Sequence, residues 1–339
     1  MLISFLVLNA NPCFAQSAKW TGPTDGPRAQ AGKQVIFIGS DLKNGGIAAV
    51  YRGFEAAANA VNWRVSAVDG EGNIDTLKKQ MMITIKSHPD GIVIAGLPQE
   101  YMGDLLTLIR QSEIALVGWH SAAKAGSDQK LFVNVSTDPI EVAKIAAEYI
   151  IRNEKGKIGV VIFNDSSFAV ANAKTKWMRE ALAKCKRCKV LAVEDHSISA
   201  VEKDIPKVII RLNKKFGHTW THNLAINDAY FDSMNFSLSN IGRSDIKNIS
   251  AGDGSNKALS RIKSGASQQV ATVAEPLNIQ GWQLVDELNR LFSGTKPSGY
   301  VTRPLLITSQ VLERAGESEK DIDSALGDYK NAYLSIWKK

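Results

Sequence analysis

The chain of 339 residues is long enough for two domains that each bury a core. With 44% hydrophobic and 22% charged residues, its composition excludes a disordered or fibrous protein and is typical of a soluble globular one. The net charge of +7, from 41 Lys and Arg against 34 Asp and Glu, is spread out, and the densest basic stretch, 184–189, is short. This favours a solvated helix end over a nucleic-acid patch, and no nucleic-acid-binding motif accompanies it. We therefore expect no nucleic-acid partner.

Residues 1–15 have the pattern of the end of a secretory signal peptide. The apolar run Leu2–Leu8 is followed by Cys13-Phe14-Ala15, which places small residues where a signal peptidase would cut before Gln16. The usual positively charged start is absent, which leaves the true start of the signal open. No later stretch reaches the roughly eighteen apolar residues of a membrane span. We expect an exported, soluble, periplasmic protein; a frayed apolar N-terminus in a cytosolic protein is the alternative.

Apolar strand-like runs alternate with amphipathic helical segments after a polar, Pro- and Gly-rich lead at 19–32. Val35–Ile38 is a continuous β-branched and aromatic run, as expected of a strand buried on both faces. The first half of the chain predicts strands at 35–38, 64–68, 91–95 and 115–119, and helices at 47–61, 74–87 and 101–111. Such a βα repeat of roughly 25 to 30 residues is typical of a parallel sheet with right-handed crossovers.

The alternation restarts with a predicted strand at 132–135. Asp138 is placed to cap the helix predicted at 139–152. Further strands are predicted at 158–163, 190–193, 223–226, 249–252 and 270–273, and further helices at 173–184, 201–216, 230–241 and 255–264. No low-complexity linker separates the halves. The sequence therefore predicts an α/β fold of two doubly wound parallel-sheet lobes joined by several short crossings of the chain.

Cys185 and Cys188 form a Cys-x-x-Cys pair between the helix at 173–184 and the strand at 190–193. Metal sites of this type need a second pair or suitably spaced histidines, and the sequence has neither. In an oxidising compartment a small structural disulfide fits best, with free buried thiols as the alternative.

Polar residues follow one predicted strand after another. Ligands of open parallel sheets bind just beyond the carboxyl ends of the strands, where these residues would gather. The segments are 40–46 (with Lys43 and Asn44), Trp119-His120-Ser121, Asn164-Asp165-Ser166, Asn227-Asp228, Asp253-Gly254 and Glu275-Pro276. For any one of them helix capping is an equal alternative, so the argument depends on the whole set. The set predicts a site for a hydroxylated ligand.

Catalytic and cofactor motifs are missing. Asn44-Gly45-Gly46 is neither a dinucleotide fingerprint nor a phosphate loop, and no Gly-x-Ser-x-Gly elbow occurs. His218 and His222 have i, i+4 spacing, but in an apparently extended segment. We expect no cofactor, no metal and no catalytic residue.

The order and spacing of several short motifs resemble the ribose-binding-protein branch of the periplasmic sugar-binding proteins of ABC importers. The resemblance runs from Lys33 to about Pro304. It rests on residues 53–56 (GFEA), 88–94 (HPDGIVI), 146–150 (AAEYI), 225–228 (AIND), 252–254 (GDG) and 271–276 (ATVAEP). It implies the type I periplasmic binding protein fold, whose two lobes are joined by a multi-strand hinge. The implied lobes are 33–137 plus 276–304 and 138–275 plus 305–339.

Carried over by position, the resemblance also implies ligand contacts. They fall on Asn44, His120, Lys174, Asn227, Asp253 and Glu275, to which the strand-end pattern adds Lys43 and Asp228. The sequence departs from the ribose binder where paired aromatics become Gly46 and Ile47, where Asp-Arg becomes His120-Ser121, and where Lys174 replaces an Arg. Trp119, Phe168 and Tyr230 are candidates for an apolar stacking face, with core packing as the alternative for each.

The resemblance implies a monomeric binding protein without enzymatic activity. It would close its lobes on a small polar ligand, a sugar or polyol, and deliver it to an ABC transporter permease. The alternatives are a ligand-sensing module of the same fold that serves a chemoreceptor, sensor kinase or autoinducer; the effector domain of a repressor; and a hydrolase.

Overall fold

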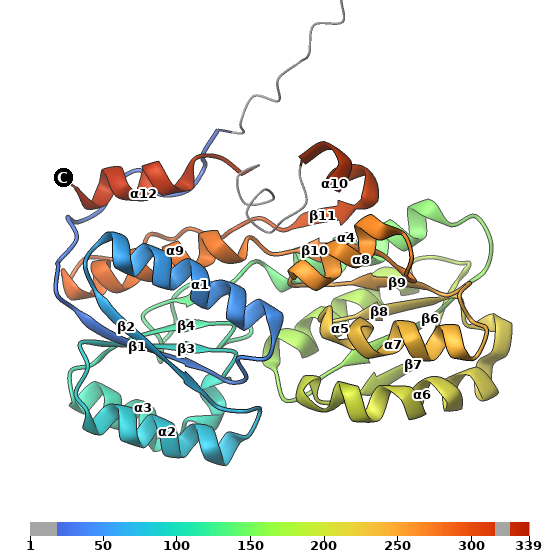
Figure 1. Ribbon diagram of the computed structural model, residues 1–339, viewed down its shortest axis with the longest axis horizontal. Helices are drawn as coiled ribbons and strands as arrows, with labels where there is room; N and C mark the ends of the chain where they lie inside the picture. Colours follow the sequence, from blue (N-terminus) through green and yellow to red (C-terminus); the bar gives the residue numbers. More distant parts are fainter. Residues whose placement is uncertain (1–18, 316–325, 339) are drawn as a thin grey trace, which may run out of the picture.

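The computed structural model describes residues 19–315 and 326–338. The predicted signal peptide at 1–15 lies outside this part of the chain. Two α/β lobes lie side by side, each built around its own sheet with helices on both faces (Figure 1). The predicted fold class is thereby confirmed.

The first lobe holds a five-stranded parallel sheet in the order β2-β1-β3-β4-β5. Its strands are β1 (Gln34–Gly39), β2 (Arg64–Asp69), β3 (Gly91–Ala95), β4 (Ala115–Trp119) and β5 (Asn134–Val135). Alternate residues of β1 pack on opposite faces of the sheet. Val35 and Phe37 face α1 (Gly45–Ala60) and α9 (Leu277–Phe292). Ile36 and Ile38 face α2 (Ile74–Lys86) and α3 (Asp104–Gln111), which follows the short helix η1 (Gln99–Tyr101).

The second lobe holds a six-stranded sheet in the order β11-β10-β9-β8-β6-β7, parallel except for the antiparallel edge strand β11. Its strands are β6 (Ile158–Asn164), β7 (Cys188–Asp195), β8 (His222–Ala225), β9 (Lys247–Ser250), β10 (Gln269–Ala274) and β11 (Leu305–Thr308). Its helices are α4 (Pro139–Asn153), α5 (Ala169–Ala183), α6 (Val201–Phe216), α7 (Ala229–Asn240), α8 (Asn256–Ser264) and α10 (Ser309–Ala315), with short helices η2 (Ile198–Ala200) and η3 (Gly217–Thr219).

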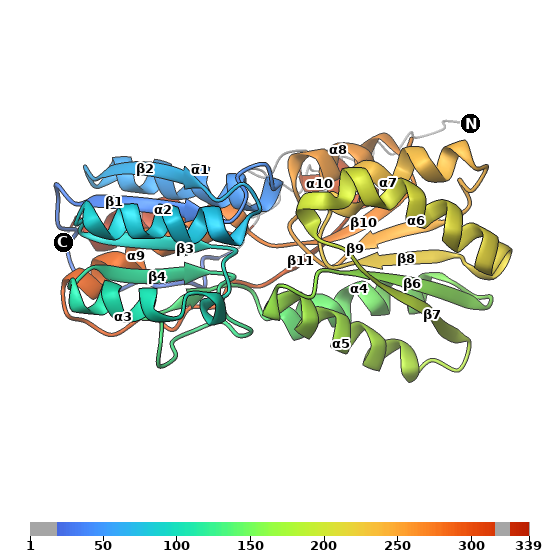
Figure 2. The same ribbon diagram turned by 90° about the horizontal axis from the view of Figure 1, so that it is seen from below.

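The chain passes between the lobes from β5 to α4, from β10 to α9 and from α9 to β11. Figure 2 shows these connections in the middle of the molecule. The helix α9 was not predicted from the sequence, and burial explains why. Gln280, Gln283, Asp286 and Glu287 are all buried on this helix, so it lacks the polar outer face that marks an amphipathic helix.

One predicted lobe boundary needs correction, because the prediction assigned all of 305–339 to the second lobe. β11 and α10 do belong there, but α12 (Tyr329–Trp337) packs on the first lobe. Trp337 stacks on Trp282 of α9, with ring centroids 5.5 Å apart, and its indole N–H donates to Asp286 Oδ1 at 2.9 Å. The aromatic side chains of α12 pack against apolar residues of α9 and against Trp20 of the N-terminal lead.

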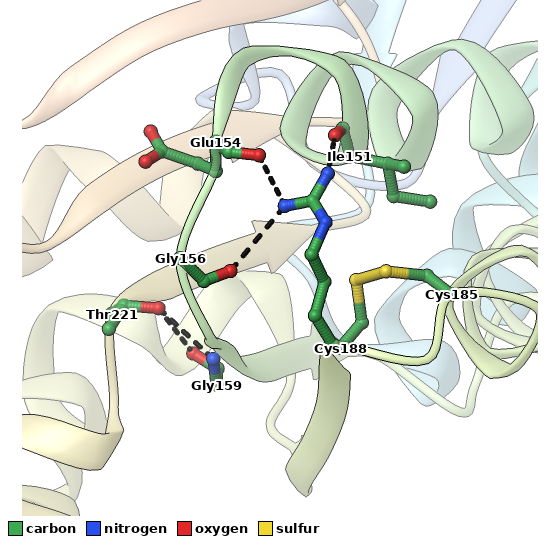
Figure 3. The surroundings of a disulfide bond; sticks show 8 residues. Ile151, Glu154, Gly156, Gly159, Cys185, Cys188 and Thr221 are labelled. Carbon is green, nitrogen blue, oxygen red and sulfur yellow. Dashed lines mark hydrogen bonds between the residues drawn. A yellow bond between two sulfur atoms is a disulfide. The ribbon is translucent and has the colours of Figure 1, made fainter.

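Cys185 and Cys188 are joined by a disulfide with an S–S distance of 2.11 Å (Figure 3). The bond spans the turn from α5 into β7. Between the two cysteines, Arg187 donates to the backbone carbonyls of Ile151 and Glu154 at the end of α4. The turn is therefore held both by the disulfide and by the neighbouring helix.

Candidate functional site

Segments that follow the carboxyl ends of strands in both sheets meet between the lobes. They line a small cavity of about 50 Å³, which we call the inner cavity. The first lobe contributes Asn44, Ile47, Gly96, Trp119 and His120; the second contributes Phe168, Val170, Ala171, Lys174, Ile198, Ile226, Asn227 and Asp253. Seven of the ten ligand contacts predicted from the sequence are in this set: Asn44, Trp119, His120, Phe168, Lys174, Asn227 and Asp253.

Glu275, at the end of β10, lies just behind the inner cavity and is 3% exposed. Lys174 Nζ lies 3.0 Å from its Oε1, and His120 Nε2 lies 2.9 Å from its Oε2. The same oxygen accepts from the Thr137 hydroxyl at 2.6 Å and from the Gln280 amide at 3.4 Å. A carboxylate offers about four acceptor positions, so these donors occupy most of its capacity. Glu275 therefore positions His120 and Lys174 and does not itself line the cavity.

The charge of Glu275 is stabilised by the same neighbours. Burial acts to raise the pKa of its carboxyl group, but His120, Lys174 and the Thr137 hydroxyl hold that pKa well below its ordinary value. The ionised carboxylate can only accept hydrogen bonds, so Nε2 of His120 carries the proton. Glu275 thus connects a residue of the first lobe to a residue of the second.

Asp253 lines the inner cavity, with a left-handed backbone conformation at φ +70°. Asn227 donates from its side-chain amide to Asp253 Oδ2. Burial raises the pKa of Asp253 to about 7, against the lowering effect of the Lys174 ammonium group. The negative charges of Asp228 and Glu275 add to the rise. This carboxyl group therefore titrates near neutral pH.

Two glycines allow the charged side chains of the site to lie close to the backbone. A Cβ built on Gly252, where φ is +151°, would lie 2.6 Å from Lys174 Nζ. A Cβ built on Gly46, at the start of α1, would lie 2.7 Å from Asp253 Oδ2. Gly46 belongs to the first lobe and Asp253 to the second, so the lobes are in contact here.

Besides Glu275, two of the predicted contacts do not line the inner cavity, and a third residue has a capping role. Lys43 is exposed beside the site. Asp228 is buried and accepts from the backbone N–H of Gly254 at 2.7 Å and from the Gln269 amide at 2.7 Å, so it shapes the loop that carries Asp253. Asn44 lines the cavity, but its side-chain oxygen caps α1 by accepting from Gly46 N at 2.9 Å. Its amide N–H groups remain available to a ligand.

The three aromatic candidates have different roles. Trp119 is 2% exposed, stacks on the His120 ring at 3.9 Å between centroids, and donates to Gln280 Oε1 at 2.7 Å. Phe168 lines the cavity from the start of α5. Tyr230 is fully buried, and its hydroxyl donates to the backbone carbonyl of Asn164 at 2.8 Å. Trp119 and Phe168 therefore supply the apolar wall, and Tyr230 belongs to the core.

A second, larger cavity of about 560 Å³ adjoins the first and shares Asn44, Gly96, Phe168 and Ile198 with it. We call it the outer cavity. Its walls come from the loops after β1, β3, β6 and β7 and from the start of α2. The strand-end pattern had marked Asp165 and Ser166, which line it. Thr137 and Gln280, the further partners of Glu275, had no sequence signal, since neither forms part of a motif.

No group of three or more His, Cys, Asp or Glu among residues 19–315 and 326–338 is placed to hold a metal ion. His218 is exposed on η3, whereas His222 is buried on β8 and lies 3.6 Å from Glu154. The two histidines do not converge. No helix in the described part of the chain is long and apolar enough to cross a membrane.

Two doubly wound lobes that both contribute polar side chains to a cavity between them have the architecture of a binding protein. The periplasmic binding protein domain matches residues 35–296, and the chain belongs to this family. A search of curated proteins finds no match.

Many solved structures share the fold. A sugar ABC transporter protein from Yersinia enterocolitica is 16% identical, with a TM-score of 0.80 over 93% of this chain and 99% of that one. An ABC transporter solute-binding protein from Agrobacterium vitis, with bound allitol, is 20% identical, with a TM-score of 0.72 over 83% and 97%. The Caulobacter myo-inositol binding protein, bound to myo-inositol, is 17% identical, with a TM-score of 0.74 over 88% and 99%. At these identities the likeness establishes the type I fold.

Proposed function

We propose that this protein captures a sugar or polyol by closing its two lobes and delivers it to the permease of an ABC transporter. The observation that carries the proposal is the convergence of His120 and Asn44 from the first lobe with Lys174, Asn227 and Asp253 from the second on one buried cavity. A ligand that contacts all of them favours the closed state by its differential affinity for that state.

The electrostatics of the site favour an uncharged ligand. Lys174 is paired with Glu275 at 3.0 Å, so its charge is compensated within the protein. Burial brings the pKa of Asp253 to about 7, so this group is partly neutral at physiological pH. Hydroxyl groups can donate to the carboxylate and accept from the ammonium and amide groups. The allitol and myo-inositol of the structural neighbours are ligands of this kind.

The remaining parts of the proposal follow from the family. The protein would act as an exported, soluble monomer outside the cytoplasm, and the closed lobes would present the surface that docks on the permease. It would make and break no covalent bond. Mass spectrometry of the protein recovered from the periplasm should find Gln16 as the first residue.

A thermal-shift screen of the purified protein tests the ligand class. The panel holds pentoses, hexoses, inositols and linear polyols, with amino acids and nucleosides as controls. A ligand at about a hundred times its Kd should stabilise the protein by roughly 2.7 kcal/mol, which raises Tm by several degrees. A shift with a carbohydrate alone supports the proposal. A shift only with amino acids or nucleosides, or with none of the panel, contradicts it.

A further inference from the structure

The inner and outer cavities differ in size by about tenfold. The inner cavity, at about 50 Å³, has room for only a few water molecules, since each needs roughly 10–15 Å³ on the same measure. A sugar ring with its hydroxyl groups does not fit there. The outer cavity, at about 560 Å³, has the volume of an ordinary ligand pocket, roughly 300–1,000 Å³. The polar side chains that the resemblance identified as ligand contacts, such as Lys174, Asn227 and Asp253, therefore line the smaller of the two cavities.

The outer cavity lies within a cleft whose lobes already touch. On one side Gly46 abuts Asp253. On the other, a Cβ built on Gly72 would lie 2.7 Å from the Cβ of Ser199, so the start of α2 meets the loop after β7. Gly72 has φ +68°, a conformation that favours glycine. Ser199 itself lines the outer cavity. The outer cavity is therefore present even though the two lobes are already in contact.

The lining of the outer cavity suits carbohydrate. Asp165 accepts from Ser167 N at 3.1 Å and from Ile198 N at 2.8 Å, and Asp195 accepts from Ser166 N at 2.7 Å. Asp165 also accepts from the Ser167 hydroxyl, and Asp195 also accepts from the Ser166 hydroxyl and the Asn164 amide. With three bonds accepted by each, both carboxylates are held in place, and each keeps about one acceptor position for a ligand hydroxyl group. Tyr101, 42% exposed, belongs to the same lining and offers an aromatic face to the apolar side of a sugar ring.

We propose that the ligand contains two linked sugar or polyol units, both held in the outer cavity, with hydroxyl groups of the first unit reaching into the inner cavity. The first unit reaches its distal hydroxyl groups toward Lys174, Asp253 and Asn227 in the inner cavity. The second unit binds to Asp165 and Asp195 of the second lobe and to the Tyr101 face of the first. This inference rests on the proposed function and adds the size class of the ligand.

Isothermal titration calorimetry with matched ligand pairs tests the inference. The probes are glucose against maltose and cellobiose, galactose against lactose and melibiose, and myo-inositol against galactinol. At least one two-unit ligand should bind tenfold or more tightly than its one-unit partner. Ile74→Trp should abolish this preference, because Ile74 is 38% exposed and lines the outer cavity, so that a larger side chain fills the space of the second unit. The one-unit ligand should lose less affinity than the two-unit ligand.

Ile83→Trp is the matched control. Ile83 lies on the same helix, is 54% exposed and lines neither inter-lobe cavity, so this variant should keep the wild-type preference. Equal affinity for one-unit and two-unit ligands in the wild type overturns the inference while leaving the proposed function standing. So does a preference that survives Ile74→Trp. Absence of binding to every carbohydrate contradicts the proposed function itself.

Discussion

The two lobes contribute different chemistry to the site. The second lobe supplies buried charged and amide side chains, Lys174, Asn227 and Asp253, each at most 8% exposed. The first lobe contributes glycines at two points of inter-lobe contact, where Gly46 lies against Asp253 and Gly72 lies against Ser199. Ligand affinity depends on two properties, the interaction of side chains with the ligand and the ability of the lobes to close, and the two lobes contribute differently to them. Substitutions in the second lobe should change the intrinsic interaction and its pH dependence, whereas substitutions at the glycines should change the ability of the lobes to close.

Glu275→Ala should have the largest effect on stability, because the Glu275 carboxylate forms hydrogen bonds with residues of both lobes. Its removal leaves Lys174 and His120 buried without their carboxylate partner, which typically costs about 3–5 kcal/mol. Urea denaturation measures the loss. Glu148→Ala is the control, since it removes a largely exposed pair with Arg152 and should cost less than about 0.5 kcal/mol. Similar losses in the two variants would show that the Glu275 network is not essential to stability.

Asp253→Asn should change how the free energy of unfolding depends on pH. The folded-state pKa of about 7 lies above the ordinary 3.8, so the folded protein keeps a proton that the unfolded chain has already lost. Stability from this group is therefore full below about pH 4 and declines as pH rises to about 7. Relative to wild type, the variant should gain up to about 1.4 kcal/mol per pH unit across that window.

Unfolding free energies measured from pH 4 to pH 8 test this gain. Asp245→Asn should instead lower stability by an amount that stays constant across this range. The hydrogen bond from Arg243 lowers the pKa of Asp245 below its ordinary 3.8, so this carboxyl group is ionised in both the folded and the unfolded protein above about pH 4. A difference between Asp253→Asn and wild type that does not change with pH would contradict the assignment.

Removing the disulfide should lower stability without altering the site. Its short loop limits the entropic contribution to about 2 kcal/mol or less. The double variant Cys185→Ser/Cys188→Ser should therefore have a lower Tm and an unchanged Kd for the ligand found by the screen. Treatment of wild type with a reductant should give the same result. A weaker Kd would mean that the turn after α5 influences Lys174 and that stability and affinity are not separable here.

Gly46→Ala should have the smallest effect, and it tests directly whether the glycine contact is needed for the lobes to close. Within a helix, alanine is favoured over glycine by roughly 0.5–1 kcal/mol, so the ligand-free protein should not lose stability. The new Cβ nevertheless meets Asp253 in the closed form, so ligand affinity should fall about tenfold, or about 1.4 kcal/mol. Gly156→Ala, where a Cβ meets open space, should leave Kd unchanged. An unchanged Kd in Gly46→Ala would show that the lobes close without this contact.

Much of the fold was predictable from local patterns. Runs such as Val35–Ile38 are strands because β-branched side chains fit a sheet covered on both faces. The strand-end residues Asn227 and Asp253 reach the cavity because parallel strands place their carboxyl ends at one edge. The helix α9 was not predictable in this way, because its polar residues are buried against distant segments.

By itself, the sequence determined the alternation of strands and helices, the two-lobed class and the polar strand ends, because all of these depend on short-range periodicity and on motifs contiguous in the chain. Tertiary structure alone decided how the polar groups are used. Glu275 is engaged by donors from residues 120, 137, 174 and 280, and α12 packs on the first lobe rather than the second. It also decided that most of the space between the lobes lies in the outer cavity. These outcomes depend on contacts between residues far apart in sequence, for which no local pattern exists.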